Sequence, residues 1–184
     1  VIRTVNVIDT RTPIITLIGD SIITQEKGYV YNDLGATATN GLGTDLTSFI
    51  VTNDNIDIDN TGTYYITYDV SDNSGNEAFQ VTRTVNVIDT TKPVITLIGD
   101  DIVNHEKDTS YNDLGAIATD FSNVDITSSI IVNNSVNINI EGSYNITYDV
   151  SDNAGNQAVQ VIRTVHVVDT IDPLITLNGN SIIN

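Results

Sequence analysis

Aspartate and asparagine side chains recur along this chain at a spacing of eighty residues. The recurring pairs are Asp9 and Asp89, Asp45 and Asp125, Asp72 and Asp152, and Asn73 and Asn153. Carboxylate and amide oxygens from irregular segments are the ligands that calcium prefers, about six to eight of them per ion. The same residue types are also ordinary in turns, where their oxygens accept bonds from nearby backbone N–H groups. The sequence leaves both interpretations open.

The elements that must position these side chains are copies of one unit. The stretch VTRTVNVIDTTKPVITLIGD at 81–100 recurs, slightly altered, at 1–20 and 161–180, and 45 of 80 positions are identical between 11–90 and 91–170. The positions that differ are concentrated at 21–30 and 41–60 in the first copy. A repeat of this length predicts two full units of about eighty residues with a fragment on each side.

Composition excludes several classes of function. The chain has no cysteine, so neither a disulfide framework nor a thiolate metal site is available. A formal net charge of −17 argues against nucleic acid as a partner, because phosphate binding needs clustered Lys and Arg. No apolar run approaches the roughly 18 residues of a membrane-spanning helix, so we expect no membrane insertion.

The unit reads as short strands separated by turns. In 61–90, apolar and aromatic residues alternate with polar ones on both sides of the turn 72–76, which predicts a β-hairpin. About seven such strands per unit indicate a small antiparallel sandwich. The spacing Gly62-x-Tyr64-x-Ile66, repeated at Gly142-x-Tyr144-x-Ile146, matches a corner in which a Tyr hydroxyl bonds the backbone just upstream.

The segments YNDLGATAT, GTYYITYDVSDNSGN and RTVNVIDTTKP together resemble the bacterial immunoglobulin-like (Ig-like) repeats of large surface and secreted proteins. This family includes the Ig-like module of pesticidal crystal proteins, and hyalin repeats are more distantly similar. The resemblance implies an all-β fold of tandem Ig-like sandwiches. We assign 1–9 to the last strand of a preceding repeat, 10–89 and 90–169 to two repeats, and 170–184 to the first strand of a following repeat.

Such a sandwich brings the recurring acidic residues together at the junctions between repeats, because the chain enters it at one end and leaves at the other. The expected set at the second junction is Asp89, Asp120, Asp125, Asp152 and Asn153. The set at the first junction is Asp9, Asn40, Asp45, Asp72 and Asn73. Calcium is therefore the candidate cofactor, with a weaker first site because Asn40 stands where the second copy has Asp120, and turn chemistry alone is the alternative.

Other chemistry is poorly supported. The histidines His105 and His166 have no histidine counterpart in the other copy, so no His-based triad recurs and we predict no enzymatic activity. A Lys–Asn amide crosslink from Lys27 would use Asn86, but the second copy has histidine at that position. Arg83 shares a strand face with core valines, and we interpret it as structural, with its guanidinium paired to a nearby carboxylate or carbonyls.

The predicted function is a non-enzymatic structural repeat of an extracellular array, as the spacer or stalk of a cell-surface adhesin, a surface layer or a fibre. Its partners would be neighbouring repeats of the same chain and other copies, with calcium stiffening the junctions. The alternative is a module that recognises a glycan or a surface protein through the variable stretches 21–30 and 41–60. Filament formation by strand donation is a third hypothesis, although the flanking fragments would supply only two strands of a sandwich.

Overall fold

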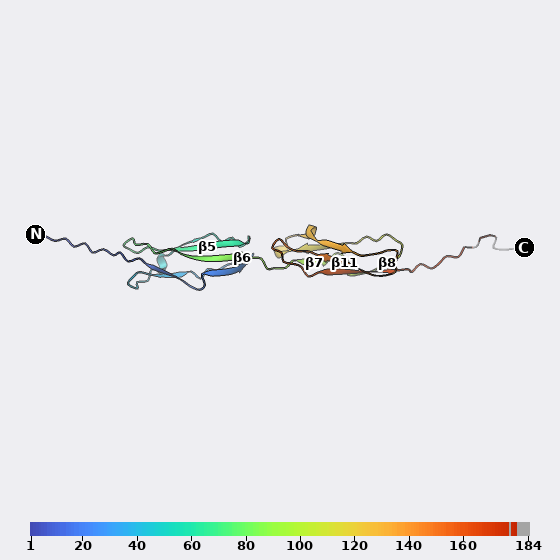
Figure 1. Cartoon of the computed structure of the whole chain (residues 1–184), viewed down its shortest axis with the longest axis horizontal. Coiled ribbons are helices and arrows are strands. Elements are labelled where there is room, and N and C mark those ends of the chain that lie inside the picture. The colour runs from blue at the N-terminus through green and yellow to red at the C-terminus, as the bar shows by residue number, and fades with distance from the viewer. Residues whose placement is uncertain (177, 180–184) are drawn as a thin grey trace. The chain divides into compact units, whose positions relative to one another are not determined.

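The computed structural model describes residues 1–176, 178 and 179. The chain divides into two compact units, Val1–Thr90 and Thr91–Asn184. The first unit contains β1 (Ile14–Leu17), β2 (Ile22–Glu26), β3 (Ala36–Thr39), β4 (Val51–Asp54), β5 (Gly62–Asp69) and β6 (Val81–Ile88). The second contains β7 (Val94–Leu97), β8 (Ile102–Glu106), β9 (Ala116–Thr119), β10 (Ile131–Asn134), β11 (Gly142–Asp149) and β12 (Val161–Val168). Figure 1 shows β5 and β6 side by side in the first unit.

Each unit consists of a two-stranded and a four-stranded sheet. In the first unit β1 pairs with β3, and the other sheet has the order β2-β6-β5-β4. The second unit repeats this pattern with β7 and β9 and with β10-β11-β12-β8. The predicted all-β sandwich is confirmed, with six strands where about seven are predicted. The segment after β3 pairs with it only through the single bridge Thr39–Asp45 and continues as the 3-10 helix η1 (Thr47–Phe49).

One pairing departs from the predicted antiparallel sandwich. Strand β2 runs parallel to β6, with Ile22 opposite Thr84 and Glu26 opposite Ile88. The chain switches sheets between β1 and β2 at Gly19, whose φ of +83° lies in the left-handed region that favours glycine. A Cβ at this position would also come within 2.9 Å of Leu34 Cδ1. Because the chain keeps its direction through this crossing, β2 meets the last strand in parallel.

Outside the two sandwiches, the part of the chain that the structure describes has no assigned strand. Residues 1–13 form none, so the predicted strand 1–9 is not assigned, and its apolar side chains are exposed. The predicted strand 170–184 falls partly outside the described residues, and its described part also forms none. None of the described residues belongs to a helix of the length and apolar character that a membrane crossing requires.

The core of each unit lies between its two sheets. Small and branched residues of β1 and β3 face the alternate residues of β5 and β6. The buried set of the first unit is Ile15, Ala36, Ala38, Leu46, Ile66, Tyr68, Val70, Val85 and Val87. The predicted tyrosine corner is confirmed in both units, since Tyr64 Oη donates to Asn60 O and Tyr144 Oη to Ile140 O, each at 2.9 Å.

A buried arginine joins the two layers. Arg83 is 1% exposed and pairs with Asp33, which also accepts a bond from Tyr68 Oη. Its Nε donates to Asp20 O at 3.1 Å and its Nη2 to Gly35 O at 3.2 Å. The structural role expected for this arginine is thus confirmed, and the second unit repeats the arrangement with Arg163, Asp113 and Tyr148.

The surroundings of Asp33 favour its charged form. Partial burial alone would raise the pKa of Asp33, but the hydrogen bonds from Tyr68 and Arg83 outweigh that effect and hold this pKa below its usual value. Burial, and then the bond to Asp33, raise the pKa of Tyr68. The ionised pair therefore contributes stability that is present above the pKa of an unfolded aspartate and is lost as pH falls through the folded value.

We predict that Asp33→Asn destabilises the first unit by about 2 kcal/mol at pH 7, because it leaves Arg83 buried without its counterion. Urea unfolding followed by circular dichroism, from pH 7 down to pH 3, measures the effect. The wild-type first unit should lose stability as the pH falls below about 4, and the variant should lose less.

The matched control is the double variant Asp33→Asn with Arg83→Met, in which the uncompensated charge is absent. It should recover part of the lost stability at pH 7. Equal stability of the single variant and the wild type over this pH range would contradict a stabilising ion pair.

Candidate functional site

The chain that leaves the first unit is fastened to the end of β2. Glu26 stands opposite Ile88 in the parallel pair, so its carboxylate reaches the residues that follow β6. Glu26 Oε1 accepts from Thr90 N and Oε2 from Thr90 Oγ1, both at 2.8 Å. The neighbouring Lys27 Nζ lies 3.2 Å from Asp89 Oδ2. We call these four residues and their counterparts in the second unit the exit clamp.

The second unit builds the same exit clamp from its own residues. Glu106 accepts from Thr170 N at 3.0 Å and from Thr170 Oγ1 at 2.6 Å. Lys107 Nζ lies 3.9 Å from Asp169 Oδ2 and 3.5 Å from Glu141 Oε1. The bonds from Thr170 lower the pKa of Glu106. In both units, therefore, the first two residues after the last strand have a defined direction.

At the opposite end of each unit, an aspartate closes the turn between the last two strands. Asp72 Oδ1 accepts from Ser74 N and Asn76 N, both at 2.9 Å, and its Oδ2 from Asn76 Nδ2 at 2.8 Å. The bonds from the Asn76 side chain and backbone are the main causes that lower the pKa of Asp72. Asp152 closes the corresponding turn with Asn156.

In the first unit the segment before β1 contacts this turn. Asn76 Nδ2 donates to Asp9 O at 3.1 Å, and the Asp9 carboxylate accepts from Arg11 Nε at 3.0 Å. The charge of Asp9 acts in the direction that raises the pKa of Asp72, although the bonds from Asn76 outweigh it. The acidic groups of the predicted first junction therefore lie close enough to repel each other.

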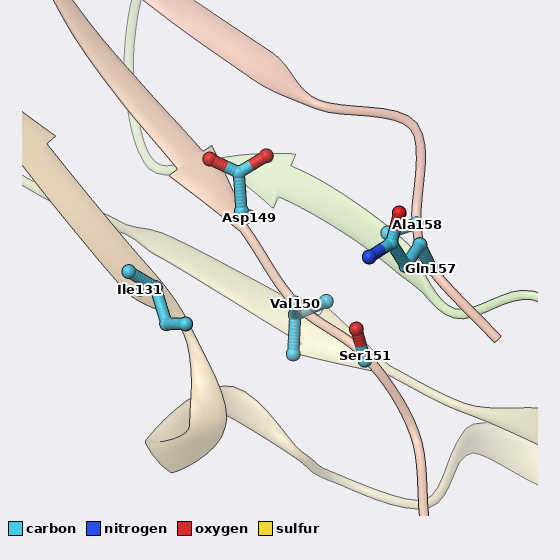
Figure 2. A pocket seen from close by; sticks show the side chains of 6 residues that line it. All are labelled: Ile131, Asp149, Val150, Ser151, Gln157 and Ala158. Atoms are coloured by element: carbon cyan, nitrogen blue, oxygen red, sulfur yellow. The ribbon is translucent and has the colours of Figure 1, made fainter. Parts of the chain in front are cut away.

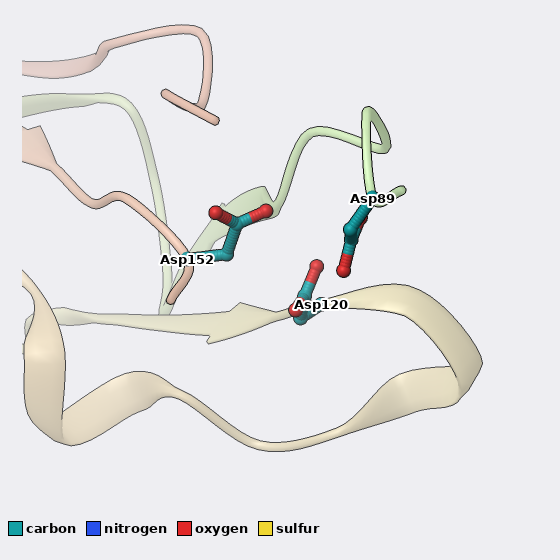
Figure 3. Close-up of side chains that lie close together, drawn as sticks. All are labelled: Asp89, Asp120 and Asp152. Atoms are coloured by element: carbon teal, nitrogen blue, oxygen red, sulfur yellow. The ribbon is translucent and has the colours of Figure 1, made fainter. Parts of the chain in front are cut away.

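Position 40, where the sequence predicts the weaker calcium site, holds asparagine in the first unit, and its counterpart in the second unit is Asp120. Asn40 Oδ1 accepts from Leu42 N at 3.0 Å and from Thr44 N at 2.8 Å, so its oxygen is turned into its own loop. Asp120, its counterpart, has a buried Oδ1 that accepts no hydrogen bond from any described residue. Carboxylate oxygens of Asp120 and Asp152 lie within 4.8 Å of each other. Figure 3 shows the side chains of Asp120 and Asp152.

Each of the remaining predicted ligands either accepts a hydrogen bond within its own loop or is exposed at the tip of a turn. Asp45 Oδ1 accepts from Thr47 N at 2.8 Å and Asp125 Oδ1 from Thr127 N at 2.9 Å, at the start of the 3-10 helices η1 and η3 (Thr127–Ser129). Asn73 and Asn153 are exposed at the tips of their turns. The structure therefore brings Asp120 together with Asp152, and Asp9 with Asp72.

The exit clamp itself was not predicted from the sequence. A signal for it is present, because Glu26-Lys27 is repeated as Glu106-Lys107 within a stretch where seven of ten positions differ between the copies. Identity at isolated positions in a variable stretch indicates a specific contact. The partner residues, some sixty positions later, follow only from the parallel pairing of β2 with β6.

A pocket of about 210 Å³ in the second unit offers no catalytic arrangement (Figure 2). It lies where the start of β10 faces the chain after β11, and its lining is Ile131, Asp149, Val150, Ser151, Gln157 and Ala158. The Asp149 carboxylate is paired with Gln160 Nε2, which lies 2.9 Å from each of its oxygens. These six residues include neither a Ser–His pair nor two carboxylates.

Comparison with known proteins gives one family and several relatives. The chain is 35% identical over 165 residues to the pesticidal crystal protein Cry22Aa of Bacillus thuringiensis, a match that covers 78% of this chain and 22% of that protein. The lipoprotein BT2262 from Bacteroides thetaiotaomicron has a TM-score of 0.38 at 19% identity, over 77% of this chain and 61% of that one. The M60 catalytic domain with CBM51-1 and CBM51-2 domains from Clostridium perfringens ZmpB has a TM-score of 0.43 at 13% identity, over 89% and 31%.

The family model that matches describes a bacterial surface protein Ig-like domain. It matches twice, over residues 15–87 and 95–167, once in each sandwich. These two segments contain the paired sheets, the tyrosine corners and the buried arginines. The chain therefore belongs to the bacterial surface protein Ig-like domain family.

Proposed function

We propose that this chain is a non-enzymatic structural repeat of an extracellular bacterial array, such as the stalk of an adhesin, a surface layer or a fibre. The observation that carries the proposal is the exit clamp. Glu26 fastens Thr90 through two hydrogen bonds, and Glu106 fastens Thr170 in the same way. A module that serves as a spacer must pass on a direction to the chain that follows, and this contact provides it.

The hydrogen bond of His166 supports a structural role. His166 Nδ1 lies 2.7 Å from Ser143 Oγ, opposite it in the β11–β12 pair. In the first unit the same cross-strand position holds Thr63 and Asn86, joined at 2.9 Å. The pair is thus a polar cross-strand contact that tolerates other residues, as expected where it stabilises the sheet rather than performs catalysis.

We further propose that calcium binds at the end of the second unit that carries Asp120 and Asp152, which we call its acidic end. The residues fit this ion, because Asp120 Oδ1 is buried without a hydrogen-bond donor, and the nearby Asp152 carboxylate retains lone pairs beyond its two bonds to Asn156. Two carboxylates within 4.8 Å repel each other by about 1 kcal/mol even in water. A divalent cation between them removes that repulsion and satisfies the buried oxygen.

Asp89 is the third carboxylate that we assign to this ion. Only residues 89–93 separate the end of β6 from the start of β7. Five residues span at most about 18 Å, so the chain itself keeps Asp89 within reach of the second unit. Calcium bound by Asp89 as well as by Asp120 and Asp152 would restrict bending at this connector, which is what a stiff spacer requires.

The exit clamp predicts a specific change in amide exchange. Replacing Glu26 by Ala should speed exchange of the Thr90 amide about fivefold, because an exposed hydrogen bond to a charged group contributes about 1 kcal/mol. Glu106→Ala is the matched control and should affect Thr170 but leave Thr90 unchanged. Unchanged exchange at Thr90 in the first variant would show that the clamp does not fix the connector.

Calcium binding predicts a gain in stability that depends on Asp120. At a calcium concentration a hundredfold above Kd the second unit should gain about 2.7 kcal/mol, or about 10 °C in melting temperature. Asp120→Asn should abolish most of this gain. Asp125→Asn should retain it, because that side chain bonds Thr127 N and asparagine can replace it there.

Small-angle scattering of the same chain tests the stiffening. Added calcium should narrow the distribution of distances between the two units in the wild type and leave Asp120→Asn unaffected. If neither melting temperature nor scattering changes on calcium addition, calcium has no part in the function.

A second function, recognition of a glycan or surface protein by the variable stretches 21–30 and 41–60, which contain the strands β2 and β4 as well as loops, is favoured by one observation. Leu42 and Phe49 are 67% and 62% exposed in the first unit, where the second unit has serine at both positions. Replacing 41–60 by residues 121–140 should abolish glycan-array binding if these stretches carry recognition. An array without any binding to the wild-type chain would remove the support for glycan recognition.

A further inference from the structure

The loop after β3 holds the one position at which the two predicted sets of calcium ligands differ. Its sequence is Asn40-Gly-Leu-Gly-Thr44 in the first unit and Asp120-Phe-Ser-Asn-Val124 in the second. Both loops close in the same way, since Asn40 N donates to Thr44 O at 2.9 Å and Asp120 N donates to Val124 O at 2.8 Å. Residues 40 and 120 thus occupy the same backbone position in the loops of the two units.

The carboxamide oxygen of Asn40 is held by two backbone donors of its own loop. Its Oδ1 accepts backbone N–H bonds from Leu42 at 3.0 Å and from Thr44 at 2.8 Å. These two donors polarise the C=O group and would stabilise the oxyanion that forms when a nucleophile adds to Cγ. The following residue is Gly41, whose exposed backbone offers that nucleophile without a side chain in its way.

We propose that Asn40 is a site of spontaneous deamidation in the folded chain. The Gly41 nitrogen loses its proton and attacks Asn40 Cγ, the tetrahedral oxyanion is held by the Leu42 and Thr44 N–H groups, and the side-chain nitrogen leaves as ammonia. Water then opens the cyclic imide and gives aspartate or its isoaspartyl isomer. The net reaction consumes one water and releases one ammonia, and it needs no enzyme or cofactor.

Two further features of the loop favour this reaction at Asn40. Among the described residues, none forms a hydrogen bond with the Gly41 N–H or with Asn40 Nδ2, so both the nucleophile and the leaving group are accessible. A side chain at position 41 is disfavoured, because its Cβ would lie 3.0 Å from Arg11 Cβ. The position of Arg11 therefore favours a glycine after Asn40 in this unit, and this residue type least hinders imide formation.

The product would match the second unit. Aspartate at position 40 reproduces the residue that the second unit encodes as Asp120, on the same loop closure. If calcium binds as proposed above, deamidation would convert the weaker acidic end of the first unit into one that resembles the second. This consequence rests on the proposed function, whereas the deamidation itself does not.

The test compares the folded chain with a synthetic peptide of residues 37–47 during incubation in metal-free buffer near pH 8. Peptide mapping by mass spectrometry measures aspartate and isoaspartate at position 40. We expect deamidation in the folded chain to be about tenfold faster than in the peptide, because only the folded loop fixes both oxyanion donors. A folded rate at or below that of the peptide would overturn the proposal.

Two controls keep the result interpretable. Gly41→Ala should slow the reaction in the folded chain, and the other Asn-Gly pair, Asn178-Gly179, reports in the same digests how this dipeptide behaves elsewhere in the chain. The Asn40→Asp variant is then titrated with calcium separately. Deamidation without a calcium-dependent gain in that variant would refute the calcium consequence alone, and absent deamidation would refute the proposed site alone.

Discussion

The ion pair between Arg83 and Asp33, with its copy in Arg163 and Asp113, is the interaction on which the rest of each unit depends. The guanidinium reaches the carbonyls of Ile18, Asp20 and Gly35 as well as the carboxylate. These groups belong to the crossing from β1 to β2 and to the loop before β3, and of the three carbonyls Gly35 O also accepts from Ile18 N at 3.0 Å. A single side chain with five donors therefore satisfies several segments at once, in a protein that has no cysteine to join its layers.

The position of the exit clamp follows from this buried pair. The bond from Arg83 to Asp20 O holds the crossing that directs β2 along β6 in parallel. The parallel register then places the end of β2 beside the end of β6, so that Glu26 meets Thr90. A core contact thus fixes the connector through two steps of backbone pairing. Loss of the ion pair would therefore destabilise the contacts of the connector as well as the core.

The sequence could predict features that depend on local spacing. The tyrosine corner, the hairpin around 72–76 and the burial of Arg83 all follow from alternation and turn chemistry over a few residues. The partner of Arg83 could not be predicted, because Asp33 lies fifty positions away in a loop where aspartate is ordinary. For the same reason, the sequence did not show that the variable stretch 21–30 contains a strand, β2, which pairs in parallel with β6.

The two units serve as controls for each other, and the comparison separates geometry from surface chemistry. Glu26, Lys27, Asp89 and Thr90 have identical counterparts in the second unit, whereas the surrounding stretch 21–30 varies. The loop from 41 onward also varies, yet Asn40 and Asp120 close it by the same backbone bond. The contacts that determine direction are therefore kept between the copies, while the charge presented at the acidic end differs. This division agrees with the proposed role of the chain as a spacer.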